Sequence, residues 1–211
     1  MKKLLLIGGS GGIGQGLIPL LKKYEVHFTD SKQLTLPSVK NIISADIVVN
    51  LAALINVNEL HKFSLLSKKL IDVNCLGSVN ILAACLPFMR LSKYGRIILM
   101  SSVFSEINIK GYGVYSSSKA FVDKLVKIAA IENAQYGITV NSIQLGYTGI
   151  GMGIDSPEEA RNKPSFKRFC RIDELPKTFS VLSLSSRPPN HIWEPFSNSK
   201  NQSLLFNVGL T

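Results

Sequence analysis

A tyrosine and a lysine lie one helical turn apart, as Tyr115 and Lys119, in the stretch GVYSSSKAF at residues 113–121. Residues i and i+4 share one face of a helix, so the lysine ammonium can approach the tyrosine phenol. A free tyrosine has a pKa of about 10, and a neighbouring positive charge favours the phenolate. The pair therefore has the chemistry of a proton donor and acceptor, although many helices hold Tyr and Lys at this spacing by chance.

A serine is the next candidate for the same site. Ser102 ends the apolar run RIILM and stands thirteen positions before Tyr115. In an open parallel sheet, ligands bind outside the carboxyl ends of the strands, so Ser102 is predicted to face the ligand crevice. Asn74, in DVNCLGS, falls inside a predicted helix. An amide there usually faces water or hydrogen-bonds locally, so its position alone gives Asn74 no role.

Glycines gather near the N-terminus in LLIGGSGGIG, at positions 8, 9, 11, 12 and 14. They follow a predicted strand and open a predicted helix, which is the context of a dinucleotide-binding fingerprint. Without side chains the backbone can approach a pyrophosphate, whose charge is met by free N–H groups and the helix dipole. The alternative is a tight turn that binds nothing, and the context favours binding.

An aspartate marks the end of the second predicted strand. Asp30 can bind both ribose hydroxyls of NAD there and repel the 2′-phosphate of NADP. Lys32 lies close by in the sequence and would favour NADP instead. We therefore expect NAD, with NADP as the alternative, unless Asp30 only caps a turn or helix.

Strands and helices alternate along the chain, which implies right-handed crossovers and a parallel sheet covered on both faces. The predicted fold is a single-domain α/β Rossmann-type doubly wound sheet of about seven strands over residues 1–211. We expect a substrate-side loop at 146–164 and a surface loop at 185–201. Strands are predicted at 4–7, 26–29, 33–36, 46–52, 95–102, 138–145 and 203–208, and helices at 13–24, 64–91, 113–136 and 173–184, with another opened by Pro37. Pro19 is predicted to bend its helix, and Pro87 to kink or end the longer one.

Composition narrows the class of protein. The chain has 211 residues, 45% of them hydrophobic and 18% charged, as one soluble globular domain would have. We find no apolar run of the roughly 18 residues that a membrane helix needs. Three cysteines without a CxxC pair indicate neither a disulfide framework nor a zinc site and fit the reducing cytoplasm. The net charge of +10 is spread along the chain with few interleaved aromatics, which disfavours nucleic-acid binding.

Over nearly its whole length the chain resembles the classical branch of the short-chain dehydrogenase/reductase family. The pieces that carry the resemblance are GGSGGIG after the first strand, NLAA after the fourth, VNCLG in the long helix, and SS followed by YSSSK. GITVNSIQLGY and NQSLLFNVGL support it. No single piece is specific, but so many in the family's order and spacing are not expected by chance.

The resemblance implies hydride transfer at a nicotinamide, between an alcohol and a ketone or aldehyde. Ser102 and Tyr115 would hold the substrate oxygen, and Tyr115 would pass the proton. Lys119 would lower the pKa of Tyr115 and bind the nicotinamide ribose, and Asn74 would complete a proton relay through water. Relatives commonly form homodimers or homotetramers through two long helices, here including residues 113–136. The cofactor residues implied by the motifs are Gly8, Gly9, Ser10, Gly12, Ile13, Gly14, Asp30, Asn50, Ala52, Tyr115, Lys119, Gly146 and Thr148.

Several positions depart from the family pattern. Leu145 replaces the proline before Gly146, Ile150 replaces a threonine, and Ile7 replaces the threonine that opens the glycine motif. A shortened loop after Ile150 would leave an open site, suited to a bulky, sugar-linked or carrier-linked substrate. Two alternatives stay open: an enzyme of the extended branch that acts on nucleotide sugars, and an NAD(H)-binding sensor or scaffold without turnover.

Overall fold

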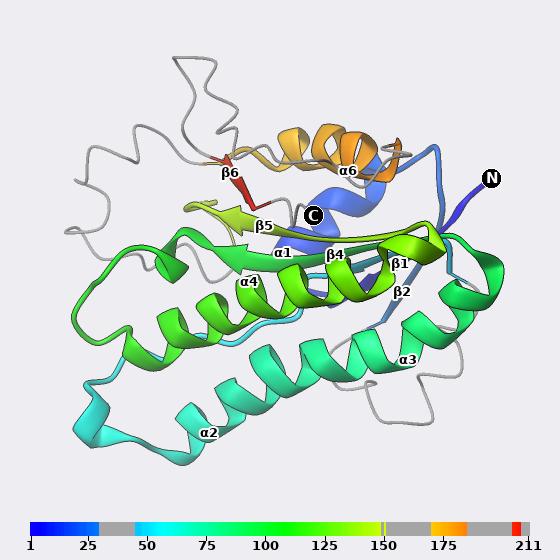
Figure 1. Ribbon diagram of the computed structural model, residues 1–211. Helices are drawn as coiled ribbons and strands as arrows, with labels where there is room; N and C mark the ends of the chain where they lie inside the picture. Colours follow the sequence, from blue (N-terminus) through cyan, green and yellow to red (C-terminus); the bar gives the residue numbers. More distant parts are fainter. Residues whose placement is uncertain (30–44, 149, 151–169, 185–203, 208–211) are drawn as a thin grey trace.

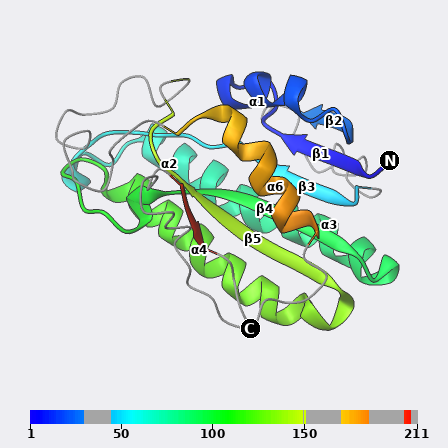
Figure 2. The ribbon, with the colours of Figure 1, turned by 90° about the horizontal axis from the view of Figure 1, so that it is seen from above.

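The computed structural model describes residues 1–29, 45–148, 150, 170–184 and 204–207. Its strands form one six-stranded sheet in the order β2-β1-β3-β4-β5-β6 (Figures 1 and 2). The first five strands pair in parallel, as predicted, whereas the last is antiparallel to its neighbour, which corrects the all-parallel expectation. The strands are β1 (Lys3–Ile7), β2 (Glu25–Thr29), β3 (Ile47–Asn50), β4 (Gly95–Ser102), β5 (Ile138–Leu145) and β6 (Leu204–Asn207).

The sheet changes direction of growth between β1 and β3. β1 pairs with β2 on one side and with β3 on the other, and β4 and β5 then extend the sheet beyond β3. In doubly wound sheets, this reversal opens a crevice at the carboxyl ends of the strands, where ligands bind. The residues that end β1, β3 and β4 are Ile7, Asn50 and Ser102, so the predicted site residues lie at this edge.

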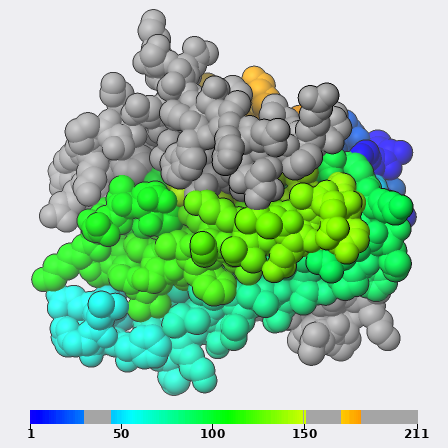
Figure 3. Space-filling model, viewed as in Figure 1, coloured from blue at the N-terminus to red at the C-terminus, as the bar shows by residue number. Residues whose placement is uncertain are grey.

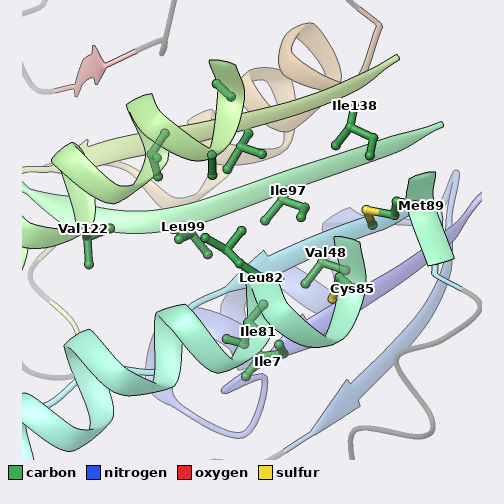
Figure 4. Packing of buried hydrophobic residues seen from close by; sticks show 14 of the residues in the cluster. Ile7, Val48, Ile81, Leu82, Cys85, Met89, Ile97, Leu99, Val122 and Ile138 are labelled. Atoms are coloured by element: carbon green, nitrogen blue, oxygen red, sulfur yellow. The ribbon is translucent and has the colours of Figure 1, made fainter. Parts of the chain in front are cut away.

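Two layers of helices cover the sheet, one on each face (Figure 1). Along β1, Leu5 and Ile7 face one side and Leu4 and Leu6 the other, as alternation in a strand requires. The first side packs against α3 (Gly77–Ser92) and α4 (Gly113–Asn133), and Figure 4 shows part of this cluster. The second side packs against α1 (Gly12–Leu17) and α6 (Leu175–Leu184). The predicted doubly wound α/β fold is confirmed.

The long predicted helix is interrupted at a different place from the one expected. α2 (Leu65–Ile71) passes into a π-helical turn, η5 (Asp72–Leu76), and then into α3, which runs through Pro87 to Ser92. Pro87 has no backbone N–H to donate to the carbonyl of Ala83, four residues earlier. Both residues are exposed, so water can hydrogen-bond to that carbonyl instead. The helix therefore does not end at Pro87, and the irregular turn surrounds Asn74.

Other boundaries differ by a few residues. The predicted helix 13–24 is α1 followed by a short 3-10 turn, Ile18–Leu20, whose first turn accommodates Pro19. The helix predicted at 113–136 is α4 followed by a 3-10 turn at Ala134–Tyr136. The third predicted strand, the helix after Pro37, Asp30 and the loop 185–201 all lie outside the described residues.

One helical segment is long and apolar enough to cross a membrane by length and composition alone. It is Leu65–Ser92, 28 residues with a mean hydropathy of 1.5 in its most apolar window. This criterion averages over a window, whereas our expectation concerned a continuous apolar run, which Lys68, Lys69 and Asp72 interrupt here. Core helices of soluble proteins meet the same criterion, and Ile81, Leu82 and Cys85 of this segment pack against the sheet (Figure 4).

Candidate active site

The glycine turn joins β1 to α1 and lies against β2 and the end of β3. Gly8 and Gly9 donate their backbone N–H groups to the Thr29 carbonyl at 2.8 and 3.1 Å. Gly8 has φ of +77°, and a Cβ there would lie 2.8 Å from the backbone nitrogen of Ala52. A Cβ on Gly14 would lie 2.5 Å from the backbone of Gly9. Both positions therefore require glycine, one for its conformation and one for the close approach of α1.

The start of α1 is open to a ligand. Gly12, Ile13 and Gly14 form its first turn, and no side chain caps the N–H groups there. Free N–H groups at a helix start attract anions. Ser10 is exposed in the same turn, and Ile13 lines a cleft at the carboxyl edge of the sheet.

The turn after β3 holds its shape through Asn50. The Oδ1 atom of Asn50 accepts a hydrogen bond from the backbone of Ala52 at 3.0 Å, and Leu51 donates to the Ile7 carbonyl at 2.8 Å. Ala52 is the residue that Gly8 approaches most closely. The structure thus places the two predicted cofactor-side turns, after β1 and after β3, in direct contact.

Ser102, Tyr115 and Lys119 meet in the cleft. Ser102 ends β4, and its hydroxyl lies close enough to the Tyr115 phenol from α4 to lower the pKa of that phenol. Ser102 Oγ also donates to the Leu145 carbonyl and accepts from the Phe104 backbone, both at 3.3 Å. Lys119 follows one helical turn after Tyr115, as predicted, and all three residues line the cleft.

The Lys119 ammonium, however, points at the sheet. Its Nζ atom donates to the Met100 carbonyl at 2.9 Å and lies 5.7 Å from the centre of the Tyr115 ring. The helix is tied down at the same level, because Ser101 Oγ donates to the Lys119 carbonyl at 3.2 Å. The lysine is therefore held by β4 rather than by the phenol.

Burial dominates the acid–base properties of Tyr115. It raises the pKa of the phenol, the hydrogen bond from Ser102 lowers that pKa, and the nearby Tyr112 raises it. Of these two neighbours, Ser102 is the one that lowers the pKa of Tyr115, and the predicted lowering by Lys119 stays a prediction. At neutral pH the phenol therefore keeps its proton.

Lys119 itself has a shifted pKa. Burial lowers the pKa of its ammonium to about 8, while the charges of Asp123 and Cys75 raise it. A group of this kind changes charge slightly above neutral pH, within the range where an enzyme works.

Asn74 is bound by distant parts of the chain. Its Oδ1 accepts from the Leu54 backbone at 2.8 Å, and its Nδ2 donates to the Leu54 carbonyl at 2.9 Å and to Ser118 Oγ at 3.0 Å. The expectation of an amide facing water or bonding locally is wrong, because the side chain is buried in the π-helical turn. Asn74 thereby joins the segment after β3 to α4, and its relay role stays a prediction.

Gly146 and Thr148 line the cleft beyond β5. Thr148 Oγ1 donates to the Ile150 carbonyl at 3.0 Å. These residues are the described start of the predicted substrate-side loop, whose remainder lies outside the described residues. Asp30 lies outside them too, so its predicted contact with ribose stays a prediction.

Sequence reasoning missed an aromatic wall beside Tyr115. The Phe104 ring stacks on Tyr112 with centroids 4.6 Å apart, and meets Tyr115 and Tyr147 edge-on at 5.7 and 5.8 Å. Phe104 and Tyr147 line the cleft. The signal was faint: Phe104 lies two residues after Ser102 and Tyr147 two residues after Leu145, so both follow strand ends at the same edge of the sheet.

The chain is similar to known proteins both in sequence and in fold. Residues 24–161, more than half of the chain, match the family model of the short chain dehydrogenases. The 3-oxoacyl-[acyl-carrier-protein] reductase FabG of Rickettsia felis is 27% identical over 176 residues, 69% of this chain and 72% of that protein. The oxidoreductase UcpA of Salmonella typhimurium is 45% identical over 78 residues, 36% of this chain and 30% of UcpA. The glycine betaine reductase ATRR of Emericella nidulans is 29% identical over 126 residues, 59% of this chain.

The chain spans only 10% of the betaine reductase and 30% of UcpA. Among solved structures, a short chain dehydrogenase/reductase family protein matches with a TM-score of 0.74 at 20% identity, covering 86% of this chain and 89% of that one. ElxO with NADP bound matches with a TM-score of 0.71 at 22% identity, covering 88% and 92%. At these identities the structures show a shared fold, and the family model covers most of the site residues described above. The chain belongs to the short-chain dehydrogenase family.

Proposed function

We propose that this protein is an NAD(P)-dependent oxidoreductase that interconverts an alcohol with a ketone or aldehyde. The observation that carries the proposal is the neighbouring pair of Ser102 and Tyr115, with buried Lys119 beside it, in the cleft that Ile13 at the start of α1 also lines. A proton donor next to an open, glycine-built turn is the arrangement that hydride chemistry requires.

The residues fit a bound dinucleotide. The uncapped start of α1 would hold the pyrophosphate, and the close packing of Gly8 and Gly14 supports this because a side chain at either position would displace the turn. Asn50 and Ala52 would border the adenosine half, and Gly146 and Thr148 the nicotinamide half. The cofactor would supply the hydride. Asp30 favours NAD, and NADP remains the competing nucleotide to be tested.

Each of the three central side chains has a separate role in the proposal. Ser102 donates a hydrogen bond to the carbonyl oxygen of the substrate and orients it. Tyr115 gives its proton to that oxygen during reduction and takes it back during oxidation. The raised pKa of Tyr115 supports reduction at neutral pH, because the phenol then carries the proton it must donate. Lys119 holds the cofactor ribose, and Asn74 fixes the helix from which Ser118 and Lys119 project.

The described wall of the cleft supports an apolar substrate. Phe104 and Tyr147 flank Tyr115, and Ile55, Leu145 and Ile150 complete the lining on this side. A sugar would need hydrogen-bond partners at these positions, and these side chains offer few. We therefore propose a carbonyl with an apolar or acyl neighbour, and 3-oxoacyl thioesters, the class named for the Rickettsia felis relative, are the first to test.

The protein is proposed to act as a homodimer or homotetramer in the cytoplasm. In Figure 3, α4, in green to yellow-green, and the α2–α3 segment, in cyan to green, form the middle and lower parts of the face in view. Apolar side chains are exposed on both helices, and such side chains mark protein contacts where they gather into a patch. They include Phe88 and Leu91 on α3 and Phe121, Ile128 and Ile131 on α4.

The test is a fluorescence titration with NADH and NADPH, followed by a panel of carbonyl compounds. The panel contains 3-oxoacyl thioesters, steroids, simple sugars and nucleotide-linked keto-sugars. Cofactor binding with turnover of an apolar carbonyl is expected. Binding without turnover of any carbonyl would favour a sensor or scaffold, turnover of keto-sugars alone would contradict the proposed substrate class, and no binding of either nucleotide would overturn the proposal.

A further inference from the structure

A second ionisable side chain lies buried on α4, one helical turn after Lys119. Asp123 is 5% exposed. Its Oδ1 accepts from Ser142 Oγ at 2.7 Å, and its Oδ2 accepts from Gln144 Nε2 at 2.9 Å. Ser142 and Gln144 are alternate residues of β5, so both side chains point to the same face of the sheet. The carboxylate is therefore held in one orientation by a rigid strand.

The charge of Asp123 acts on a lysine whose direct partner is neutral. Lys119 donates to the Met100 carbonyl, and a buried ammonium on a neutral partner is costly to keep charged. Residues i and i+4 of a helix are neighbours, so Asp123 supplies a fixed negative charge close to the ammonium. Burial lowers the pKa of Lys119, and Asp123 is the larger of the two influences that raise it.

Gln144 connects Asp123 to the other side of the site. Besides Asp123, its Nε2 donates to Ser105 Oγ at 2.9 Å and to Glu106 Oε1 at 3.4 Å. Ser105 ends the 3-10 turn Val103–Ser105, which follows Ser102 directly. A continuous set of hydrogen bonds thus joins the helix of Tyr115 and Lys119 to the segment that carries Ser102.

Among the described residues few other charges lie near Lys119 and Asp123, and one of them is the half-buried Lys127, one helical turn after Asp123. Lys119 is faced by Tyr115 and Asp123 from its own helix, by Cys75 from η5, and by the Met100 carbonyl from β4. Asp123 is faced by Ser142 and Gln144 from β5, and the exposed Glu106 lies beyond Gln144.

We propose that Asp123 is a positioning residue that keeps the Lys119 ammonium charged and aligned with Ser102 through Gln144. This inference rests on the proposed function only for its consequence in catalysis. The electrostatic effect of Asp123 on Lys119 does not depend on bound cofactor and can be measured in the free protein.

The direct test follows the titration of the Lys119 side chain by NMR. Protein is made with carbon-13 lysine, and the Cε signal of Lys119 is assigned by its loss in Lys119→Arg. In Asp123→Asn the midpoint is expected to fall by about one pH unit, which is a tenfold loss of proton affinity. Glu132→Gln, which removes an exposed carboxylate from the same helix, is the control and should leave the midpoint in place.

A second readout separates positioning from simple structural support. In Asp123→Asn, the alkaline limb of the pH profile of kcat/KM should move to lower pH by the same amount as the Lys119 midpoint. Near pH 6, Lys119 is protonated in both the variant and the wild type, so their kcat/KM values should be close. A structural role alone would lower kcat/KM at every pH and leave the limb unmoved. If Asp123→Asn does not fold, Asp123→Ser removes the same charge, supplies a hydroxyl that can still hydrogen-bond, and is expected to give the same shift.

The result that would contradict this inference differs from the result that would contradict the proposed function. An unmoved Lys119 midpoint in a folded Asp123 variant overturns the inference, whatever the activity. A shifted midpoint in a protein that turns over no carbonyl supports the charge relation and contradicts the proposed function instead.

Discussion

The glycine turn offers a prediction in which one substitution has opposite effects at two positions of α1. A Cβ on Gly14 would lie 2.5 Å from the Gly9 Cα and carbonyl oxygen, where ordinary contact begins at 3.4 Å. α1 must therefore move by about 0.9 Å (3.4 − 2.5), against backbone that cannot yield. Overpacking of this size costs about 1–3 kcal/mol. For a chain of this length we expect Gly14→Ala to lower Tm by about 2–12 °C.

Gly16→Ala is the matched control on the same helix. Gly16 is exposed, and its Cβ would lie 3.3 Å from the Cγ2 methyl of Ile172, a side-chain end that can rotate. Alanine in place of glycine in a helix gains about 0.5–1 kcal/mol. Gly16→Ala is therefore expected to be neutral or stabilising.

The assays are urea denaturation and a fluorescence titration with NADH. Gly14→Ala should bind NADH at least about tenfold more weakly, because the shifted turn misplaces the groups that hold the pyrophosphate. Gly16→Ala should bind as wild type does. The reasoning is refuted if both variants change stability in the same direction, or if Gly14→Ala keeps its affinity.

Three further predictions concern pH, assembly and the choice of nucleotide. Burial lowers the pKa of Lys119 to about 8, so its charge is present below that pH and lost above it. The kcat/KM for reduction should therefore be flat from pH 6 to 7 and fall above about pH 8. A fall in kcat/KM only near pH 10.5 would contradict this. The double variant Phe121→Glu with Ile131→Glu should shift the protein toward the monomer in analytical sedimentation. The Tm of the monomer should not fall, since both side chains are exposed. An unchanged oligomeric state would exclude this face as the subunit interface. Asp30→Ala should relax discrimination against NADPH, and an unchanged preference would show that Asp30 only caps a turn.

The arrangement of the strand ends could be predicted from the sequence. Short apolar runs followed by glycines, by Asn50 and by Ser102 defined where β1, β3 and β4 stop. Because parallel strands end at one edge, the pattern also predicted that these residues would share a crevice. The direction of β6 could not be predicted, since an apolar run has the same pattern in parallel and antiparallel strands.

The partners of individual side chains were harder to predict. Spacing placed Lys119 beside Tyr115 but could not show that its ammonium would bind the Met100 carbonyl, because that contact depends on how α4 sits on β4. Asn74 reaches Leu54, twenty residues away, through a π-helical turn that no local pattern indicated. Asp123 is visible in the sequence one turn after Lys119, yet its role depends on Ser142 and Gln144 of a separate strand.

The central claim is that the hydroxyl of Tyr115 transfers the proton, and a pair of tyrosine variants tests it most directly. Tyr112 is also buried, also has a pKa raised by burial, and stacks on Phe104 behind the cleft. Turnover and NAD(P)H affinity are to be measured in Tyr115→Phe and Tyr112→Phe. We predict that Tyr115→Phe loses about 10²–10⁴-fold in kcat and keeps its cofactor affinity, while Tyr112→Phe keeps both. Comparable kcat values in the two variants would contradict the account.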